Sequence, residues 1–97
     1  MKVLFSIHPE HANNILSGTK KYEFRRKIFT RDDIETVVIY ATSPVCKVIG
    51  EFEIDEILQD EPKKIWAATK ENAGIDFDFF DTYFSGRHQA FALKVKN

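Results

Sequence analysis

Three charged side chains at short, fixed spacing are the residues of this chain best suited to chemistry. Lys20, Glu23 and Arg25 fall within residues 18–27, directly after a glycine. An arginine can hold a phosphate through two hydrogen bonds, a lysine adds a point charge, and a glutamate can orient both or accept from a base amine. The alternative is a solvated strand face, where an ion pair contributes about 0–1 kcal/mol. The residue types alone leave both interpretations open.

A basic cluster continues from this segment. It comprises Arg25, Arg26, Lys27 and Arg31, with Tyr22 and Phe24 interleaved. Such a cluster could follow a phosphate chain while its rings stack on bases. It could equally be the solvated surface of a loop, with the two aromatic residues in the core.

Carboxylates and possible metal ligands offer weaker candidates. Glu51, Glu53 and Asp55 alternate along one strand, which is typical of a polar outer face. If one of them faces Lys20, we expect it to be Glu51, because a glycine beside it predicts a bend. His8, His11 and Cys46 lack a fourth ligand at a recognised spacing, so we predict no metal site. His8 is expected to cap a helix or to border a cleft.

Length and composition are those of a small globular protein. The 97 residues predict one domain, 1–97, and the net charge of −1 neither indicates nor excludes a nucleic-acid ligand. The single cysteine, Cys46, cannot form an intramolecular disulfide, which fits a reducing compartment. No apolar run suits a signal peptide or approaches the ~20 residues of a membrane span. We expect a cytoplasmic monomer or weak dimer with no membrane partner.

Hydrophobic periodicity predicts five strands and three short helices. Alternation and β-branched residues favour strands, whereas spacings of three and four, with proline at the start and glycine at the end, favour helices. The Phe77, Phe80 and Phe84 stripe and Trp66 are expected in the core rather than in a ligand groove. Gly50 predicts a bulge or bend. The expected strands are 2–7, 20–26, 36–42, 45–58 and 90–95, and the expected helices are 9–17, 62–74 and 76–84.

These elements predict an α+β fold. Strands dominate, and the helices sit in the connections rather than alternating strictly with strands, so a doubly wound sheet is disfavoured. We expect a strongly curved mixed sheet that forms a small barrel.

The charged segment resembles a known family signature. Gly18-x-Lys20-x-x-Glu23-x-Arg25 matches the G-x-K-x-x-E-x-R pattern of the ASCH (activating-signal-cointegrator homology) domain. Three more stretches resemble that family in the same order along the chain: 7–9, 38–50 and 83–86. The resemblance implies a PUA-like β-barrel of about five or six strands. It also implies a cleft between the first helix and the barrel, lined by the signature charges and close to the turn Thr42-Ser43-Pro44.

The resemblance implies RNA or nucleotide binding, and some relatives are hydrolases, including an acetylcytidine amidohydrolase and a ribonuclease. The amidohydrolase branch has a threonine where this chain has Glu23, so that hydroxyl nucleophile is absent. Our leading hypothesis is a cofactor-free module that binds RNA or a nucleotide-like ligand. Its predicted ligand-binding residues are Lys20, Glu23, Arg25, Arg26, Thr42, Ser43, Pro44 and His8.

Two rival functions stay open. The first is a small hydrolase acting on a modified nucleoside or on RNA, in which Lys20 activates a nucleophile and Glu23 or Glu51 transfers protons. The second is a protein-interaction domain, for which near-neutral net charge is the only indication.

Overall fold

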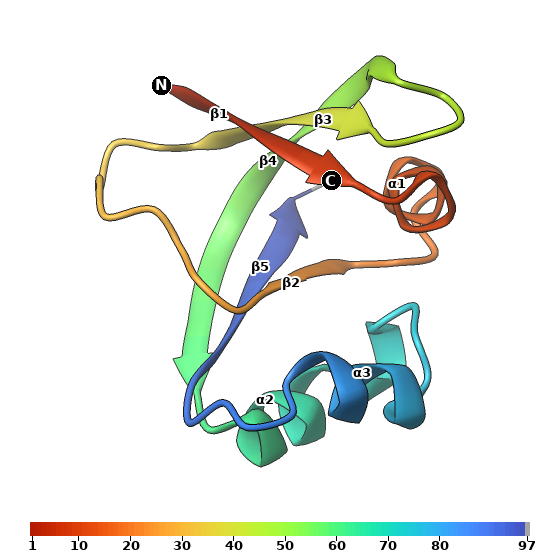
Figure 1. The fold of residues 1–97 in the computed structure, drawn as a ribbon. Coiled ribbons are helices and arrows are strands. Elements are labelled where there is room, and N and C mark those ends of the chain that lie inside the picture. Colours follow the sequence, from red (N-terminus) through yellow and green to blue (C-terminus); the bar gives the residue numbers. More distant parts are fainter. Residues whose placement is uncertain (97) are drawn as a thin grey trace.

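The computed structural model describes residues 1–96 and contains five strands, three α-helices and one 3-10 turn (Figure 1). The predicted elements are all present. The charged strand is shorter than predicted, and the long strand starts and ends two residues later. The helix predicted over 62–74 is α-helical only as far as Thr69 and continues as a 3-10 turn to Asn72. The elements are β1 (Lys2–Ile7), α1 (Pro9–Ser17), β2 (Tyr22–Arg25), β3 (Thr36–Ala41), β4 (Lys47–Asp60), α2 (Pro62–Thr69), η1 (Lys70–Asn72), α3 (Phe77–Tyr83) and β5 (Ala90–Lys96).

The strands form one mixed sheet in the order β1-β3-β4-β5-β2. The β1–β3 pair is parallel, and the other three pairs are antiparallel. This confirms the α+β class and the mixed sheet. Within residues 1–96, β1 and β2 are the two sheet edges and do not pair with each other, so the strand pairing does not show the closure that a barrel requires.

The long strand β4 bends the sheet. Its first half pairs with β3 and its second half pairs with β5, so this central strand links the β1–β3 part of the sheet to the β5–β2 part (Figure 1). The register shifts once beside Gly50 and again at Asp55, and each extra residue increases local bend and twist. The bulge predicted at Gly50 is therefore confirmed. A Cβ atom there would lie 3.0 Å from Leu16 Cδ2, so this glycine also lets α1 approach the strand.

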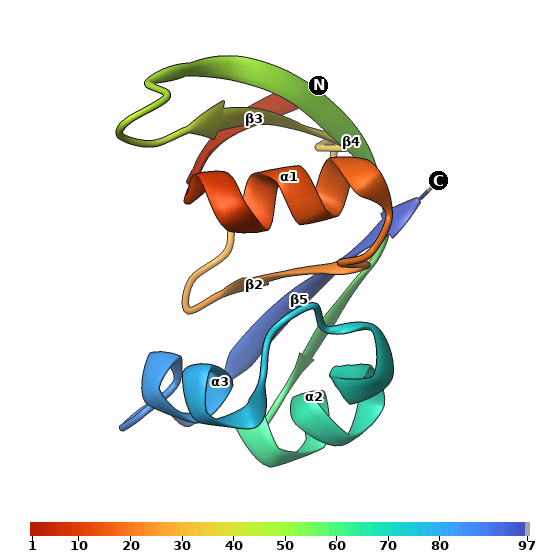
Figure 2. The ribbon, with the colours of Figure 1, turned by 90° about the vertical axis from the view of Figure 1, so that its right-hand side faces the viewer.

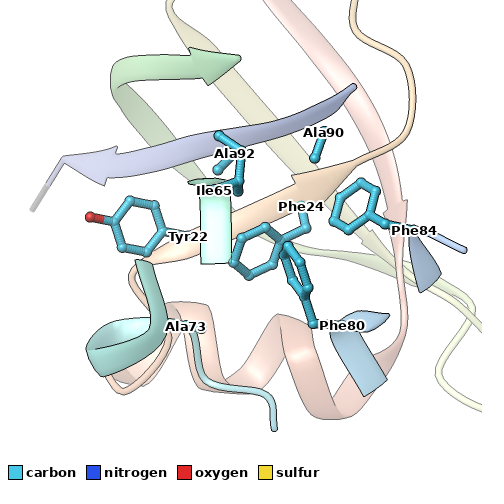
Figure 3. Close-up of a cluster of buried hydrophobic side chains, with 8 residues drawn as sticks. All are labelled: Tyr22, Phe24, Ile65, Ala73, Phe80, Phe84, Ala90 and Ala92. Atoms are coloured by element: carbon cyan, nitrogen blue, oxygen red, sulfur yellow. The ribbon is translucent and has the colours of Figure 1, made fainter. Parts of the chain in front are cut away.

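Two hydrophobic clusters hold the layers together. The first joins α1 to β1, β3 and β4, and includes Ile15, Val37 and Ile39. The second joins β2 and β5 to α2 and α3, and Figure 3 shows Phe24 of β2 facing Phe80 of α3. In Figure 2, β2 runs between α1 on one side and α2 and α3 on the other.

This position buries β2 on both faces. Tyr22, Glu23 and Phe24 are all buried, so the solvated strand face considered for Glu23 is wrong. The physical reason is that helices cover both sides of this edge strand, a situation that sequence alternation alone does not reveal.

The aromatic stripe of α3 is only partly in the core. Phe80 and Phe84 are 2% and 3% exposed, as predicted, whereas Phe77 is 50% exposed, which overturns its assignment to the core. Asp76 caps α3 by accepting a hydrogen bond from the Phe79 backbone N–H at 2.9 Å. His8 occupies the predicted N-cap position of α1, although its side chain makes no capping hydrogen bond.

Candidate functional site

A cavity of about 570 Å³ opens between α1, the end of β1, β2 and the segment that leads into α3. The three signature side chains Lys20, Glu23 and Arg25 all line it, as does His8. We call it the main cavity. Its other lining residues are Ser6, Ile7, Glu10, His11, Phe24, Gly74, Ile75, Asp76, Phe79 and Tyr83.

Lys20 is an almost fully buried cation, with 3% of its surface exposed. Gly18 ends α1 in a left-handed conformation (φ 89°), and the turn delivers Lys20 just ahead of β2. Its ammonium nitrogen donates a hydrogen bond to the carbonyl oxygen of Ala73 at 2.9 Å and lies 4.7 Å from the centre of the Phe24 ring. Burial lowers the pKa of Lys20 from 10.5 to about 8, although Glu23 opposes the shift.

Glu23 is a buried carboxylate that pairs with Arg25 but accepts no hydrogen bond within residues 1–96. Within residues 1–96 no hydrogen-bond donor reaches its carboxylate, and the nearest cationic atom is Arg25 Nε at 3.3 Å. Burial raises the pKa of Glu23, and the charges of Arg25 and Lys20 only partly offset that rise. The carboxylate therefore faces the main cavity with free acceptor capacity.

Arg25 extends from β2 toward the opposite sheet edge. Its guanidinium carbon lies 4.0 Å from the centre of the Phe5 ring, and Nη2 donates a long hydrogen bond, 3.4 Å, to the carbonyl oxygen of Ser6. Its Nε atom is buried and lacks an aligned acceptor, even though Glu23 Oε2 is close. The guanidinium thus holds N–H groups that a ligand in the cavity could satisfy.

Some cavity residues were not predicted from the sequence. The His11 imidazole packs edge-on against Phe79, with ring centres 5.1 Å apart, and its Nδ1 atom is buried without a partner in the described residues. Burial lowers the pKa of His11, and the positive charge of Lys20 lowers it further. The available signal was the spacing of His8 and His11, which puts both on one face of the helix preceding the signature.

Other predicted site residues lie elsewhere. Arg26 lines a second cavity beside the main one. Thr42, Ser43 and Pro44 are not among the lining residues, although the Thr42 N–H donates to the Ile7 carbonyl directly behind the cavity wall. Glu51 is 49% exposed and pairs with Lys2 Nζ at 3.0 Å, because β4 directs it to the outer surface. Its predicted position opposite Lys20 is wrong.

The charged signature, the helix before it and the curved sheet can be compared with known proteins. The model of the ASCH domain family matches residues 5–97. The chain belongs to the ASCH domain family. Among residues 1–96 of this ASCH domain, no helix is long and apolar enough to cross a membrane, and no three His, Cys, Asp or Glu side chains group as metal ligands would.

Curated relatives and solved structures agree with this assignment. The ASCH domain is 32% identical over 96 residues to an ASCH domain-containing ribonuclease of Zymomonas mobilis, covering 99% of this chain and 65% of that protein. It is 27% identical over 94 residues to the large ribosomal subunit protein uL22 of Ureaplasma parvum, covering 97% of this chain and 30% of that protein. The chain thus spans less than two thirds of either curated relative.

The crystal structure of ASCH from Zymomonas mobilis has the same fold. It superposes with a TM-score of 0.90 at 33% identity, covering 97% of this chain and 66% of that one. A crystallised variant of the same protein gives a TM-score of 0.92 at 32% identity, covering 100% and 70%.

Proposed function

We propose that this ASCH domain binds single-stranded RNA in the main cavity. The observation that carries the proposal is the convergence of Lys20, Glu23 and Arg25 on one cavity, with the first two almost fully buried. Buried charges with unused hydrogen-bonding capacity are expensive to maintain, and they are more common at functional sites than in ordinary cores.

The lining suits a nucleotide unit. Arg25 offers paired donors for phosphate oxygens, Lys20 supplies a nearby positive charge, and Glu23 can accept from a base amine. Phe79 and Tyr83 present rings on which a base can stack. A volume of about 570 Å³ lies within the range of small-ligand pockets.

The name of the Zymomonas mobilis relative, a ribonuclease, supports RNA as the ligand rather than another nucleotide-like molecule. The signature also supports a PUA-like barrel. In that architecture the gap between β1 and β2 would be the place where Arg25 reaches across to Phe5 and Ser6.

An Arg25→Lys variant tests the binding proposal. It keeps the positive charge but removes the paired donors, so we expect RNA affinity to fall about tenfold, or about 1.4 kcal/mol. Fluorescence anisotropy of a labelled single-stranded RNA decamer, titrated at several NaCl concentrations, measures the dissociation constant. Arg31→Lys is the matched control, because Arg31 pairs with Asp33 and lines neither cavity. Equal affinity of the Arg25→Lys and control proteins at every salt concentration would reject the proposal.

A ribonuclease activity is the second candidate, and the pKa values of two cavity residues favour it. Burial shifts the pKa of Lys20 down to about 8 and that of Glu23 upward, toward values useful for proton transfer near neutral pH. In the reaction the Glu23 carboxylate takes the proton of a ribose 2′-hydroxyl, and the ribose 2′-oxygen attacks the adjacent phosphorus. The bond from phosphorus to the 5′-oxygen breaks, and the Lys20 ammonium protonates that oxygen. The products are a 2′,3′-cyclic phosphate and a 5′-hydroxyl.

A Glu23→Gln variant separates cleavage from binding. Loss of the general base is expected to slow cleavage by about 10²–10⁴-fold. Affinity for the decamer should change less than about threefold, within roughly 0.7 kcal/mol, because glutamine keeps a carbonyl oxygen that can accept from a nucleobase amine. Denaturing gels give the rate, and mass spectrometry identifies the cyclic phosphate. Cleavage by Glu23→Gln at the wild-type rate, or no product from the wild type, would exclude this reaction and leave the binding proposal intact.

A further inference from the structure

A second cavity of about 420 Å³ lies beside the main one, is shallower and more open to solvent, and has a different character. Its lining residues are Phe5, Arg25, Arg26, Lys27, Tyr83 and Arg87. Every charged residue among them is cationic, although the chain as a whole has a net charge of −1. We call it the basic cavity. Because Arg25 and Tyr83 line both cavities, the two adjoin along these side chains.

Two of the four cations of the basic cavity stack on aromatic rings, and three of the four lack an acidic partner in the part of the chain that the structure describes. The guanidinium of Arg26 lies 4.6 Å from the centre of the Tyr83 ring, as that of Arg25 lies over Phe5. A guanidinium stacked by its face keeps its N–H edge free for phosphate oxygens. Within residues 1–96, no ion pair involves Arg26, Lys27 or Arg87.

Arg87 reaches the other three cations of the basic cavity only in the folded protein. It follows Gly86, whose φ of 77° turns the chain between α3 and β5, and it lies far along the sequence from the other three cations. The turn therefore brings a fourth positive charge to a cluster that the sequence assigns only to residues 25–31. Arg26, Lys27 and Arg87 have no acidic partner within residues 1–96, so their like charges repel one another, and an anion between them would relieve the repulsion.

We propose that the basic cavity binds a second phosphate of the same RNA chain whose neighbouring nucleotide occupies the main cavity. This inference rests on the proposed function and narrows its substrate class to oligonucleotides rather than single nucleotides. Repeating phosphates match two adjoining cavities that share an arginine, and the flanking Phe5 and Tyr83 rings suit a single strand with accessible bases.

The test compares two double variants with equal loss of charge. Arg26→Gln with Arg87→Gln removes two cations from the basic cavity. Arg31→Gln with Lys94→Gln removes two that pair with Asp33 and Asp55 outside both cavities. We expect the first to weaken binding of the RNA decamer about tenfold relative to the second. The slope of log affinity against log NaCl should also become shallower by about 0.7, which is the contribution of the one phosphate that the protein no longer neutralises.

A mononucleotide supplies the second arm of the test. Uridine 3′-monophosphate, measured by calorimetry, should bind both double variants within about twofold of each other, because it requires only the main cavity. If the two double variants bind the decamer equally while Arg25→Lys still weakens binding, the basic cavity is not a phosphate site and the proposed function stands. If the mononucleotide loses as much affinity as the decamer, the two-site arrangement is wrong. If the wild type binds no RNA, both proposals fail.

Discussion

Lys20→Met is expected to fold at least as stably as the wild type at pH 7 while losing tenfold or more of its RNA affinity. Methionine matches the length and burial of the lysine stem but carries no charge. The expected loss, at least about 1.4 kcal/mol of binding free energy, reflects the removal of an almost fully buried cation from the cavity wall. Anisotropy with the RNA decamer and thermal unfolding give the two quantities.

Stability should not fall, because the fold disfavours the charge on Lys20. Its pKa of about 8, against 10.5 for an ordinary lysine, means that all its interactions together favour the neutral amine by roughly 3 kcal/mol. Methionine removes that penalty and also loses the hydrogen bond to Ala73, which contributes about 1 kcal/mol. A buried charge that costs stability is the pattern expected of a residue kept for function.

The same shift predicts a pH dependence of known sign. Between pH 8 and 10.5 the unfolded chain keeps the Lys20 proton and the folded protein releases it, so Lys20 makes the free energy of unfolding rise with pH. Below about pH 8 the folded protein keeps the Lys20 proton, so the full free-energy cost of burying this charge is present. RNA affinity should fall over the same range as the cation is lost.

Urea unfolding of the wild type and Lys20→Met from pH 7 to pH 10.5 isolates this contribution, since the other titrating groups are common to both. The gap in unfolding free energy should narrow as pH rises. A constant gap would show that Lys20 has an ordinary pKa, and wild-type RNA affinity in Lys20→Met would remove Lys20 from the site.

Gly74→Ala is expected to destabilise the protein by about 3 kcal/mol and to abolish RNA binding at the main cavity. A Cβ atom at position 74 would lie 2.5 Å from Lys20 Cβ and 3.0 Å from Lys20 Cα. The second contact is with backbone, so rotation of a side chain cannot relieve it. The φ of +71° adds roughly 1–2 kcal/mol of strain for any residue with a side chain, and overpacking adds about 1–3 kcal/mol.

Gly86→Ala is the matched control for backbone strain. Its φ of +77° is similar, but a Cβ atom there would meet nothing within 4 Å, so it should cost only about 1 kcal/mol. Thermal unfolding gives the loss of stability in each variant. Binding of uridine 3′-monophosphate, which requires only the main cavity, then separates the steric displacement of Lys20 from the loss of a glycine. Equal destabilisation of both variants would mean that Gly74 does not hold Lys20 in place.

Local sequence determined most of the elements. Proline at the first position of α1, glycine after its end and Asp76 ahead of α3 mark helix boundaries through backbone chemistry that needs no distant partner. Gly50 likewise marked a bulge in β4. The spacing of Lys20, Glu23 and Arg25 indicated the candidate site, because a turn followed by a short strand fixes their relative positions within the chain.

Burial and neighbours were decided by the tertiary structure. Alternation favoured a half-solvated β2, but packing of α1 on one side and α2 and α3 on the other buried Glu23 and gave it a raised pKa. Glu51 is a carboxylate that could have transferred protons in the cavity, but it faces outward. Its orientation depends on the register of β4. Phe79 and Arg87 joined the cavities from segments whose own patterns carried no such signal.

The sequence by itself determined where the helices begin, the bulge and the charged signature, since each depends on residues close together along the chain. Only the tertiary structure decided which charges are buried, which cations gather around the basic cavity, and that Gly74 makes room for Lys20. Those features depend on contacts between distant segments, and the electrostatic cost of a charge depends on the surroundings that those contacts create.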